Sequence, residues 1–421
     1  MLADDLGYGD VGCFGQKLIE TPNLDRLAAE GLRFTNAYAG AAVCAPSRCC
    51  LMTGLDTGHG RIRNNKSAAG ERVSLRPEDV TVAEVLKRAG YRTAAIGKWG
   101  LGEAGSRGVP NAQGFDDWYG FLNQDHALDY YPRHLWENER EVFPDGNQGA
   151  RQKEYVQELF TRRALSFLDA RGRDPFFLYL AYTVPHASSE LGRDTGDGYP
   201  VPGYGPYAGR DWPRPEKGYA AMVGMLDSDV GRVMEKLRSL GVERDTLVVF
   251  ASDNGATTEG GHSPSFFGSG GGFRGAKGTL YEGGIRTPAI ARWPGRVKAG
   301  TVCDAPWAFW DFLPTAAELA GVEAPRGLDG VSIAPLLQGA AELPREALYW
   351  EAHGKKEFRQ AVRMGRWKGL RARGGAGELY DLAVDPGERE NLWAARPEVA
   401  ARIVSVMERA RSDSEEYPVA R

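Results

Sequence analysis

Apolar segments that alternate with helical patterns constrain the fold of this chain more than any other feature. The segments RTAAIG, FFLYLAY and TLVVFAS have the length of buried strands, and helical patterns at 153–171 and 216–240 separate them. Strands that are apolar on both faces are typical of parallel sheets with helices on either side. The sequence therefore predicts an α/β sandwich with a mostly parallel central sheet.

The pattern changes near Arg345. Short strand-like segments (ALYWEA, RQAVRM, WKGLRA, GELYDL) follow one another and lead into a helix that begins near Pro397. This order predicts a small antiparallel sheet with a terminal helix, joined to the rest through the segment QGAAELPRE. We expect a large α/β domain at 1–344 and a small C-terminal α+β subdomain at 345–421.

Polar residues follow several predicted strands. Because the carboxyl ends of parallel strands meet at one edge of a sheet, such residues can converge on one site. Carboxylate and amide oxygens in this group favour Ca²⁺ or Mg²⁺ over zinc. Considered separately, the pair Asp4 and Asp5 and the pair Asp253 and Asn254 are each explained equally well by a solvated acidic loop or a turn. The residues in question are Asp4 and Asp5, Lys98, His186, and Asp253 with Asn254.

The segment CAPSRCCLMTG carries the most unusual local pattern. Pro46 favours a helix start, so the Cys44 thiol is expected at a helix N-terminus, where backbone N–H groups and Arg48 favour an anion. A phosphatase-type thiolate site needs an arginine six residues after the cysteine, but Cys50 stands there. A structural zinc site is not indicated either, because the cysteines do not supply a second pair at the required spacing. The residues around Cys44 also differ from those around the cysteine of papain-like or caspase-like proteases.

The arrangement CxPSRxxxxTG resembles the pattern of the sulfatase family. The resemblance continues through DDLGYGD, GKWG, SDNG and LYEGGIRTP to ELYDLAVDPGERENL, and so covers nearly the whole chain. It implies an alkaline phosphatase-like fold and hydrolysis of a sulfuric ester. The expected substrate is an aryl or carbohydrate sulfate, either a sulfated small molecule or a glycan.

The resemblance also implies a role for each candidate residue. A formylglycine-generating enzyme would oxidise Cys44 to formylglycine, whose hydrate attacks sulfur and later expels sulfate. Asp4, Asp5, Asp253 and Asn254 would bind the metal, with residue 44 completing its ligands. The sulfate oxygens would contact Arg48, Lys98 and Lys277, and His186 would lie beside the leaving oxygen.

The sequence departs from the family pattern at two places. Many members have a histidine where this chain has Gly100, so the function of that histidine is lost, carried out by water, or taken by another residue such as His126. Members also have a longer apolar strand before the aspartate pair, whereas only Met1–Ala3 precede it here. This short start predicts a weakly held aspartate pair. It also suggests a natural start further upstream, with a periplasmic or secreted protein as the consequence.

Composition excludes some functions and leaves two alternatives open. The 421 residues have a net charge of −4, which gives no general basis for binding nucleic acid, and they contain no membrane-spanning apolar run. Five cysteines in so long a chain do not form a disulfide framework. One alternative is a phosphoester or phosphonate hydrolase of the same superfold. The other is an inactive binding protein in which Cys44 stays a thiol.

Overall fold

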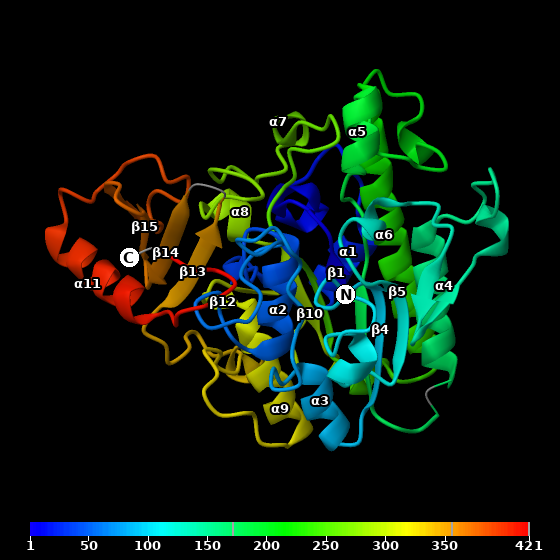
Figure 1. Ribbon diagram of the computed structural model, residues 1–421, viewed down its shortest axis with the longest axis horizontal. Helices are drawn as coiled ribbons and strands as arrows, with labels where there is room; N and C mark the ends of the chain where they lie inside the picture. Colours follow the sequence, from blue (N-terminus) through cyan, green and yellow to red (C-terminus); the bar gives the residue numbers. More distant parts are fainter. Residues whose placement is uncertain (171, 355–356, 420–421) are drawn as a thin grey trace.

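A ten-stranded sheet forms the centre of the molecule (Figure 1). The computed structural model describes residues 1–421 except 171, 355–356 and 420–421. The strand order is β11-β2-β10-β9-β1-β8-β4-β5-β6-β7. The strands are β1 (Leu2–Ala3), β2 (Leu32–Phe34), β4 (Arg92–Lys98), β5 (Asp117–Phe121), β6 (Leu135–Glu137), β7 (Arg140–Val142), β8 (Phe176–Ala181), β9 (Val248–Ser252), β10 (Ala289–Arg292) and β11 (Thr301–Cys303).

The central strands of this sheet are parallel. β9, β1, β8, β4 and β5 pair in one direction, while β10 lies antiparallel to both β9 and β2. At the opposite edge, β6 and β7 are also antiparallel. The predicted mostly parallel sheet is therefore confirmed, and the carboxyl ends of its central strands lie at one edge.

Helices cover both faces of the sheet. Ala94 and Ile96 of β4 pack with α1, α4 and α6, whereas Ala95 between them packs with α2, α3 and α9, because successive strand residues point to opposite faces. The helices are α1 (Pro22–Ala29), α2 (Cys44–Thr53), α3 (Val82–Arg88), α4 (Val156–Ala170), α5 (Ser189–Thr195), α6 (Arg214–Ser239), α7 (Pro264–Phe267), α8 (Glu282–Ile285), α9 (Phe312–Ala320), α10 (Ala334–Leu337) and α11 (Pro397–Arg409).

Helix α6 shows why these helices form where they do. The helix begins at Arg214, directly before Pro215, and Met222, Leu226, Val230 and Val233 lie at helical spacing on its buried face. Each such side chain contributes about 1.5–3 kcal/mol when it is fully buried. The helical pattern expected at 216–240 is confirmed, and its apolar stripe belongs to the core.

The segment 103–150 is more regular than its composition indicates. Its richness in glycine and aromatic residues predicts an irregular insertion, but β5, β6 and β7 extend the main sheet here. The glycines serve close pairing: a Cβ at Gly120 would lie 1.9 Å from the carbonyl oxygen of Gly97, and one at Gly97 would lie 1.8 Å from that of Ala181. The prediction of an irregular loop is therefore wrong for these strands.

The strand before the aspartate pair is short but well fixed. β1 pairs with β8 on one side and β9 on the other, and its Leu2 and Ala3 are buried. Before it, an apolar cavity of about 690 Å³ lies between the facing edges of β8 and β9. Asp4 and Asp5 are fully buried all the same, and the Asp4 N–H donates to the Val184 carbonyl at 3.2 Å. The expectation of a weakly held pair is wrong.

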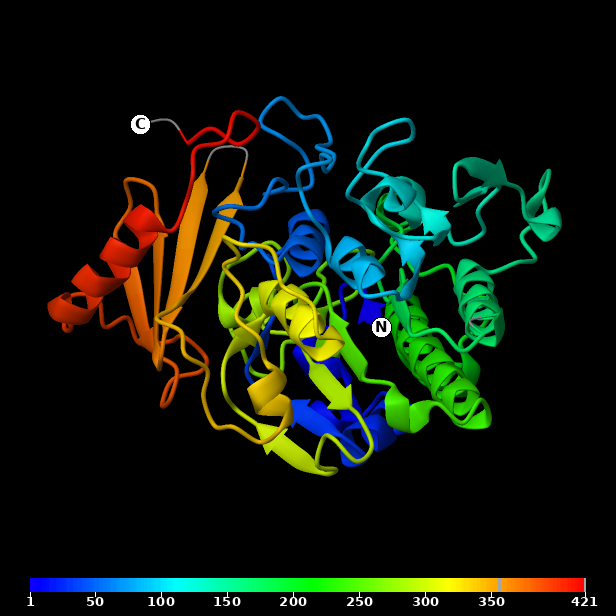
Figure 2. The same ribbon diagram turned by 90° about the horizontal axis from the view of Figure 1, so that it is seen from below.

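A second, four-stranded sheet stands beside the main one (Figure 2). It is antiparallel, in the order β13 (Leu348–His353), β14 (Phe358–Met364), β15 (Trp367–Ala372) and β16 (Gly377–Asp381), and α11 packs on its outer face. Its inner face joins the main body through a cluster that includes Tyr38, Trp310 and Trp350. The division into domains at 344 stays a prediction.

A small two-stranded sheet is separate from the two larger sheets. The short strands β3 (Ala37–Tyr38) and β12 (Trp307–Ala308) pair in parallel, and their Tyr38 and Ala308 pack in one cluster with residues of the second sheet. Among the described residues, no helix has both the length and the apolar character needed to cross a bilayer.

Candidate active site

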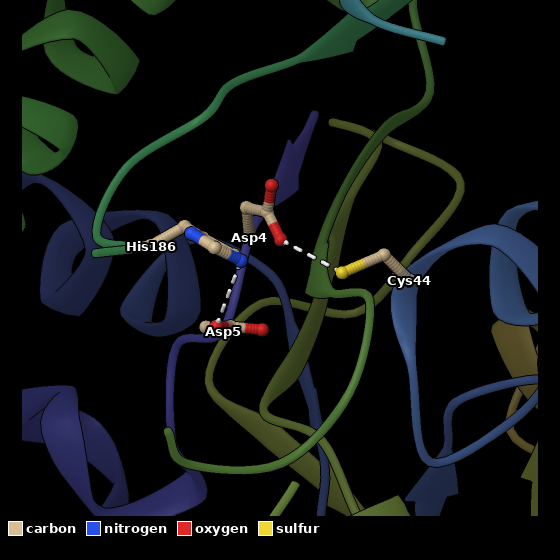
Figure 3. A group of neighbouring side chains, drawn as sticks. All are labelled: Asp4, Asp5, Cys44 and His186. Carbon is tan, nitrogen blue, oxygen red and sulfur yellow. Dashed lines mark hydrogen bonds and ion pairs between the residues drawn. The ribbon is translucent and has the colours of Figure 1, made fainter. Parts of the chain in front are cut away.

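The carboxyl edge of the main sheet brings the predicted site residues together. Asp4 and Asp5 follow β1, Asp253 and Asn254 follow β9, Lys98 ends β4, and His186 lies on the loop after β8. Cys44 opens α2 at the same edge. Ligand atoms of Cys44, Asp4, Asp5 and His186 all lie within 4.8 Å of one another (Figure 3). Segments that are far apart in the sequence thus form one buried site.

Cys44 is the first residue of α2, as its sequence context predicts. The helix is held at its start by Asn65, whose Oδ1 accepts from the Ala45 N–H at 3.0 Å, and it ends at Gly54, which has φ 72°. The Cys44 thiol donates to Asp4 Oδ1 at 3.4 Å. Burial, followed by the Asp4 carboxylate, raises the pKa of this thiol well above its ordinary value. The unmodified residue is therefore a protonated thiol.

Arg48 and Lys98 place fixed positive charge beside Cys44. Lys98 Nζ lies 2.6 Å from Asp4 Oδ2, and Arg48 NH2 lies 2.8 Å from Asp253 Oδ2. Burial alone would raise the pKa of Asp4, but Lys98 and the other cations hold it well below its usual range. Both cations are almost completely buried, so their positions are determined by the carboxylates that they contact.

Asp5, Asp253 and Asn254 form the oxygen-rich part of the site. Asp5 has φ 67°, an uncommon value for a residue other than glycine, and its N–H donates to Asp253 Oδ1 at 3.2 Å. Asn254 Nδ2 donates to Asp5 Oδ1 at 2.8 Å. Burial and the nearby Asp4 carboxylate raise the pKa of Asp253 to about 6. Carboxylates crowded in this way are typical of a site that binds a cation.

The donor atoms fit a hard divalent cation. The Oδ1 atom of Asn254 is fully buried and has no hydrogen-bond donor within the described residues. A buried amide oxygen without a partner is costly. Together with the carboxylates of Asp4, Asp5 and Asp253, it supplies the oxygen ligands that such an ion prefers. This buried cluster can bind a metal.

Lys277 joins the cluster to the protein surface. Its Nζ donates to Asp5 Oδ2 at 2.8 Å, to Glu259 Oε1 at 3.0 Å and to His186 Nε2 at 3.1 Å. An ammonium only donates, so His186 Nε2 is an acceptor, and Nδ1 carries the proton and donates to the Ala187 carbonyl at 2.6 Å. Burial and Lys277 lower the pKa of His186. The imidazole is therefore neutral.

Sequence reasoning did not identify Glu259 as a site residue. It lies in the loop DNGATTEGG, five residues after Asn254, and Lys277 contacts it directly. A single acidic residue in a glycine-rich loop after a strand was the available signal, but its meaning depends on Lys277, which is distant in the sequence.

The region around Gly100 is filled by a glutamine. A Cβ at Gly100 would lie 2.4 Å from Gln124 Nε2, and that nitrogen donates to the Gly100 carbonyl at 3.3 Å. The His126 ring instead packs against Phe121 and His134, with ring centroids 4.7 and 4.2 Å apart. Burial lowers the pKa of His126 to about 4. The compensating role suggested for His126 stays a prediction.

Comparison with known proteins shows to which family the chain belongs. A family model described as Sulfatase matches residues 1–322, well over half of the sequence. The chain belongs to the sulfatase family. A second model, described as N-sulphoglucosamine sulphohydrolase, C-terminal, matches residues 273–413 of this sulfatase.

Two human proteins are similar to this sulfatase. Arylsulfatase A from Homo sapiens is 35% identical, over 95% of this chain and 84% of the relative. N-acetylgalactosamine-6-sulfatase from Homo sapiens is 34% identical, over 83% of this chain and 67% of the relative. The sulfatase is accordingly a sulfuric ester hydrolase, and its family is generally metal-dependent.

Solved structures resemble it along nearly the whole chain. Ps i-CgsB in complex with k-i-k-neocarrahexaose has a TM-score of 0.83 and 29% identity, covering 100% of this chain and 94% of that one. A structure in complex with its substrate D-glucosamine-2-N,6-O-disulfate has a TM-score of 0.77 and 25% identity, covering 97% and 96%. The phosphonate monoester hydrolase of Agrobacterium radiobacter shares the fold, with a TM-score of 0.69, 21% identity and coverage of 100% and 98%.

Proposed function

We propose that this sulfatase hydrolyses an aryl or carbohydrate sulfate through a formylglycine made from Cys44. The observation that carries this proposal is the position of Cys44: its Sγ lies 3.4 Å from Asp4 at the start of α2, where Lys98 also contacts Asp4. A nucleophile here faces both a cluster of oxygen ligands and fixed positive charge. That combination suits attack on a sulfate ester.

The residue at position 44 needs maturation to act in this way. As formylglycine it would supply a hydrated aldehyde, with one hydroxyl for attack on sulfur and the other for release of sulfate. A formylglycine-generating enzyme is the maturation partner that this requires. The surrounding chain contributes the orientation, because Asn65 and the glycine that ends α2 fix the helix that carries residue 44.

Asp4, Asp5, Asp253 and Asn254 would bind a Ca²⁺ or Mg²⁺ ion, together with residue 44. The Oδ1 of Asn254, which has no partner in the part of the chain that the structure describes, and the three buried carboxylates support this ligand set. Such an ion would polarise an oxygen of the ester and favour ionisation of the attacking hydroxyl.

The cations of the site would bind the sulfate. Arg48 is fixed by two hydrogen bonds to Asp253 Oδ2, and it therefore presents its charge without reorganisation. Lys98 and Lys277 would complete the contacts to the non-bridging oxygens. When Lys277 turns an N–H toward the sulfate, His186 Nε2 becomes free to take up the proton that the attacking hydroxyl loses and to pass it to the leaving oxygen of the alcohol.

A sulfated glycan is a suitable substrate class. The chain resembles structures solved with a neocarrahexaose and with a glucosamine disulfate over almost its full length. These likenesses support a carbohydrate sulfate as the natural ester, with aryl sulfates as convenient test substrates.

The proposal is tested by co-expressing the chain with a formylglycine-generating enzyme. We expect mass spectrometry of the peptide around Cys44 to show the aldehyde, and the protein to hydrolyse nitrophenyl sulfate faster than nitrophenyl phosphate. Cys44→Ala should lower sulfate hydrolysis at least about 1000-fold, because the nucleophile is lost. Full activity with an unmodified thiol, or a preference for the phosphate, would contradict the proposal.

A further inference from the structure

We propose that Glu259 selects the alcohol portion of the substrate. In this inference its carboxylate accepts a hydrogen bond from a neutral sugar hydroxyl next to the sulfated carbon, and it repels substrates with a second anionic group at that place. The inference rests on the proposed function, which puts the leaving alcohol on the side of the site where His186 and Lys277 lie.

Glu259 is the carboxylate of the site that faces outward. Asp4, Asp5 and Asp253 are fully buried, whereas the side chain of Glu259 is 38% exposed. Lys277 bridges the two environments, since its Nζ contacts both Asp5 and Glu259. A sulfate held near Lys277 therefore has its alcohol portion close to Glu259.

The Glu259 carboxylate has acceptor capacity to spare. Oε1 accepts from Lys277 Nζ at 3.0 Å, and Oε2 accepts from Ser189 Oγ at 2.8 Å. A carboxylate offers about four lone-pair sites, so each oxygen can take a further donor. Burial would raise the pKa of Glu259, but the Lys277 charge and the hydrogen bond from Ser189 lower it, and the group stays ionised. An ionised carboxylate accepts hydroxyls and disfavours anions.

The loop around Glu259 is held in place on both sides. Its N–H donates to Thr257 Oγ1 at 3.1 Å, and its carbonyl accepts from the Tyr199 hydroxyl at 3.0 Å. The following residue, Gly260, packs so closely that a Cβ there would lie 2.5 Å from the Cβ of Ala187. The carboxylate is therefore preorganised beside the loop that carries His186, which favours a specific contact.

The proposed hydrogen bond between Glu259 and the sugar hydroxyl should change substrate discrimination by a measurable amount. A hydrogen bond from a substrate hydroxyl to a charged group gives about 10- to 100-fold discrimination against an analogue that lacks the hydroxyl. A second sulfate in the same place would face a like charge in a partly desolvated site. An aryl sulfate has no such hydroxyl and gains nothing from Glu259.

The test compares Glu259→Ala and Glu259→Gln with Glu190→Gln, which removes an exposed charge on the neighbouring helix α5. The substrates are nitrophenyl sulfate, the methyl galactoside monosulfate that wild type cleaves fastest among the 2-, 3- and 4-isomers, its analogue that lacks the hydroxyl on an adjacent carbon, and its disulfate with the second sulfate at that carbon. All proteins are fully converted at residue 44, and thermal melting confirms that they are folded.

For wild type and E190Q we expect kcat/KM to favour the monosulfate over the deoxy analogue by about 10- to 100-fold. In E259A the loss on the monosulfate should exceed the loss on nitrophenyl sulfate about tenfold or more. E259Q should raise the disulfate-to-monosulfate ratio. Equal losses of E259A on both esters, or unchanged ratios, would overturn the inference.

The outcomes for wild type separate this inference from the proposed function. Wild type that cleaves nitrophenyl sulfate but no galactoside sulfate would overturn the role of Glu259 alone. Wild type that cleaves no sulfate ester would overturn the proposed function, and the inference would fail with it.

Discussion

Two buried clusters of charge use similar residues for different purposes. The site cluster consists of Asp4, Asp5, Arg48, Lys98 and Asp253 at the carboxyl edge of the main sheet. The docking cluster lies where the second sheet meets α8, and there Lys368 Nζ is 2.9 Å from both Glu282 Oε1 and Glu388 Oε1. Tyr38 and Arg286 complete the docking cluster through Glu282 Oε2.

The clusters differ in the surroundings of one carboxylate in each, Glu282 in the docking cluster and Asp253 in the site cluster. Burial by itself raises the pKa of Glu282, but Lys368, Arg286 and Arg363 bring it down to about 2. In the site cluster, burial and Asp4 raise the pKa of Asp253 to about 6. The cations thus outweigh burial at Glu282, whereas at Asp253 burial and the neighbouring carboxylates outweigh Arg48 and Lys98. The first arrangement holds two parts of the protein together, and the second leaves affinity for a cation.

Removing the lysine of the docking cluster should cost the most stability. Lys368→Met leaves Glu282 and Glu388 buried without their cation, so we expect the free energy of unfolding to fall by about 3–5 kcal/mol in urea titrations. The double variant with Glu282→Gln should recover part of the loss, because less uncompensated charge remains. A loss below about 1 kcal/mol would break the distinction between the two clusters.

The same substitution in the site cluster should affect activity instead. Lys98→Met is expected to lower kcat/KM for nitrophenyl sulfate about 10²- to 10³-fold, since a preorganised cation at the sulfate is lost. Its cost in stability should be smaller than that of K368M, because Arg48 NH2 still lies 3.6 Å from Asp4 Oδ2. Steady-state kinetics and urea unfolding on the same preparations check both statements. Activity close to that of wild type would refute the assignment of Lys98.

Calcium binding should have the smallest of the three effects, and it should involve the site cluster and not the docking cluster. Calcium at about 100 times its Kd is expected to raise the free energy of unfolding by about 2.7 kcal/mol, and a chelator should remove this gain together with the activity. Asp253→Ala should lose the gain, whereas K368M should keep it, because K368M leaves the oxygens of Asp4, Asp5 and Asp253 in the site cluster unchanged. Melting curves with calcium, with magnesium and with chelator provide the measurement. An equal gain in D253A would place the ion elsewhere.

Local patterns in the sequence predicted the strands and the helix that carry the site residues. Apolar strands that lead into Asp4, Lys98 and Asp253 could be recognised because strand length and burial depend on neighbouring residues. The start of α2 at Cys44 could be recognised for the same reason. The strand β5 could not, because its Gly120 permits a close approach to β4 that no local pattern records.

Other parts of the site and of its support depend on contacts between distant segments. Lys277 and Glu259 can be recognised as site residues only when their loops are seen to meet beside His186. Lys368 and Glu388 look like ordinary surface residues in the sequence, yet both are fully buried against Glu282. A charged side chain is usually solvated, and the exceptions are determined by what packs around it.

The sequence by itself determined the parallel sheet, the helix that begins at Cys44 and the family, because each depends on residues that are neighbours along the chain. Only the tertiary structure decided that His186 is neutral with its proton on Nδ1, that Asn254 has an oxygen without a partner among the described residues, and that Glu259 faces outward from the site. The physical reason is that protonation, hydrogen bonding and exposure are set by distances between segments, and those distances exist only after the chain has folded.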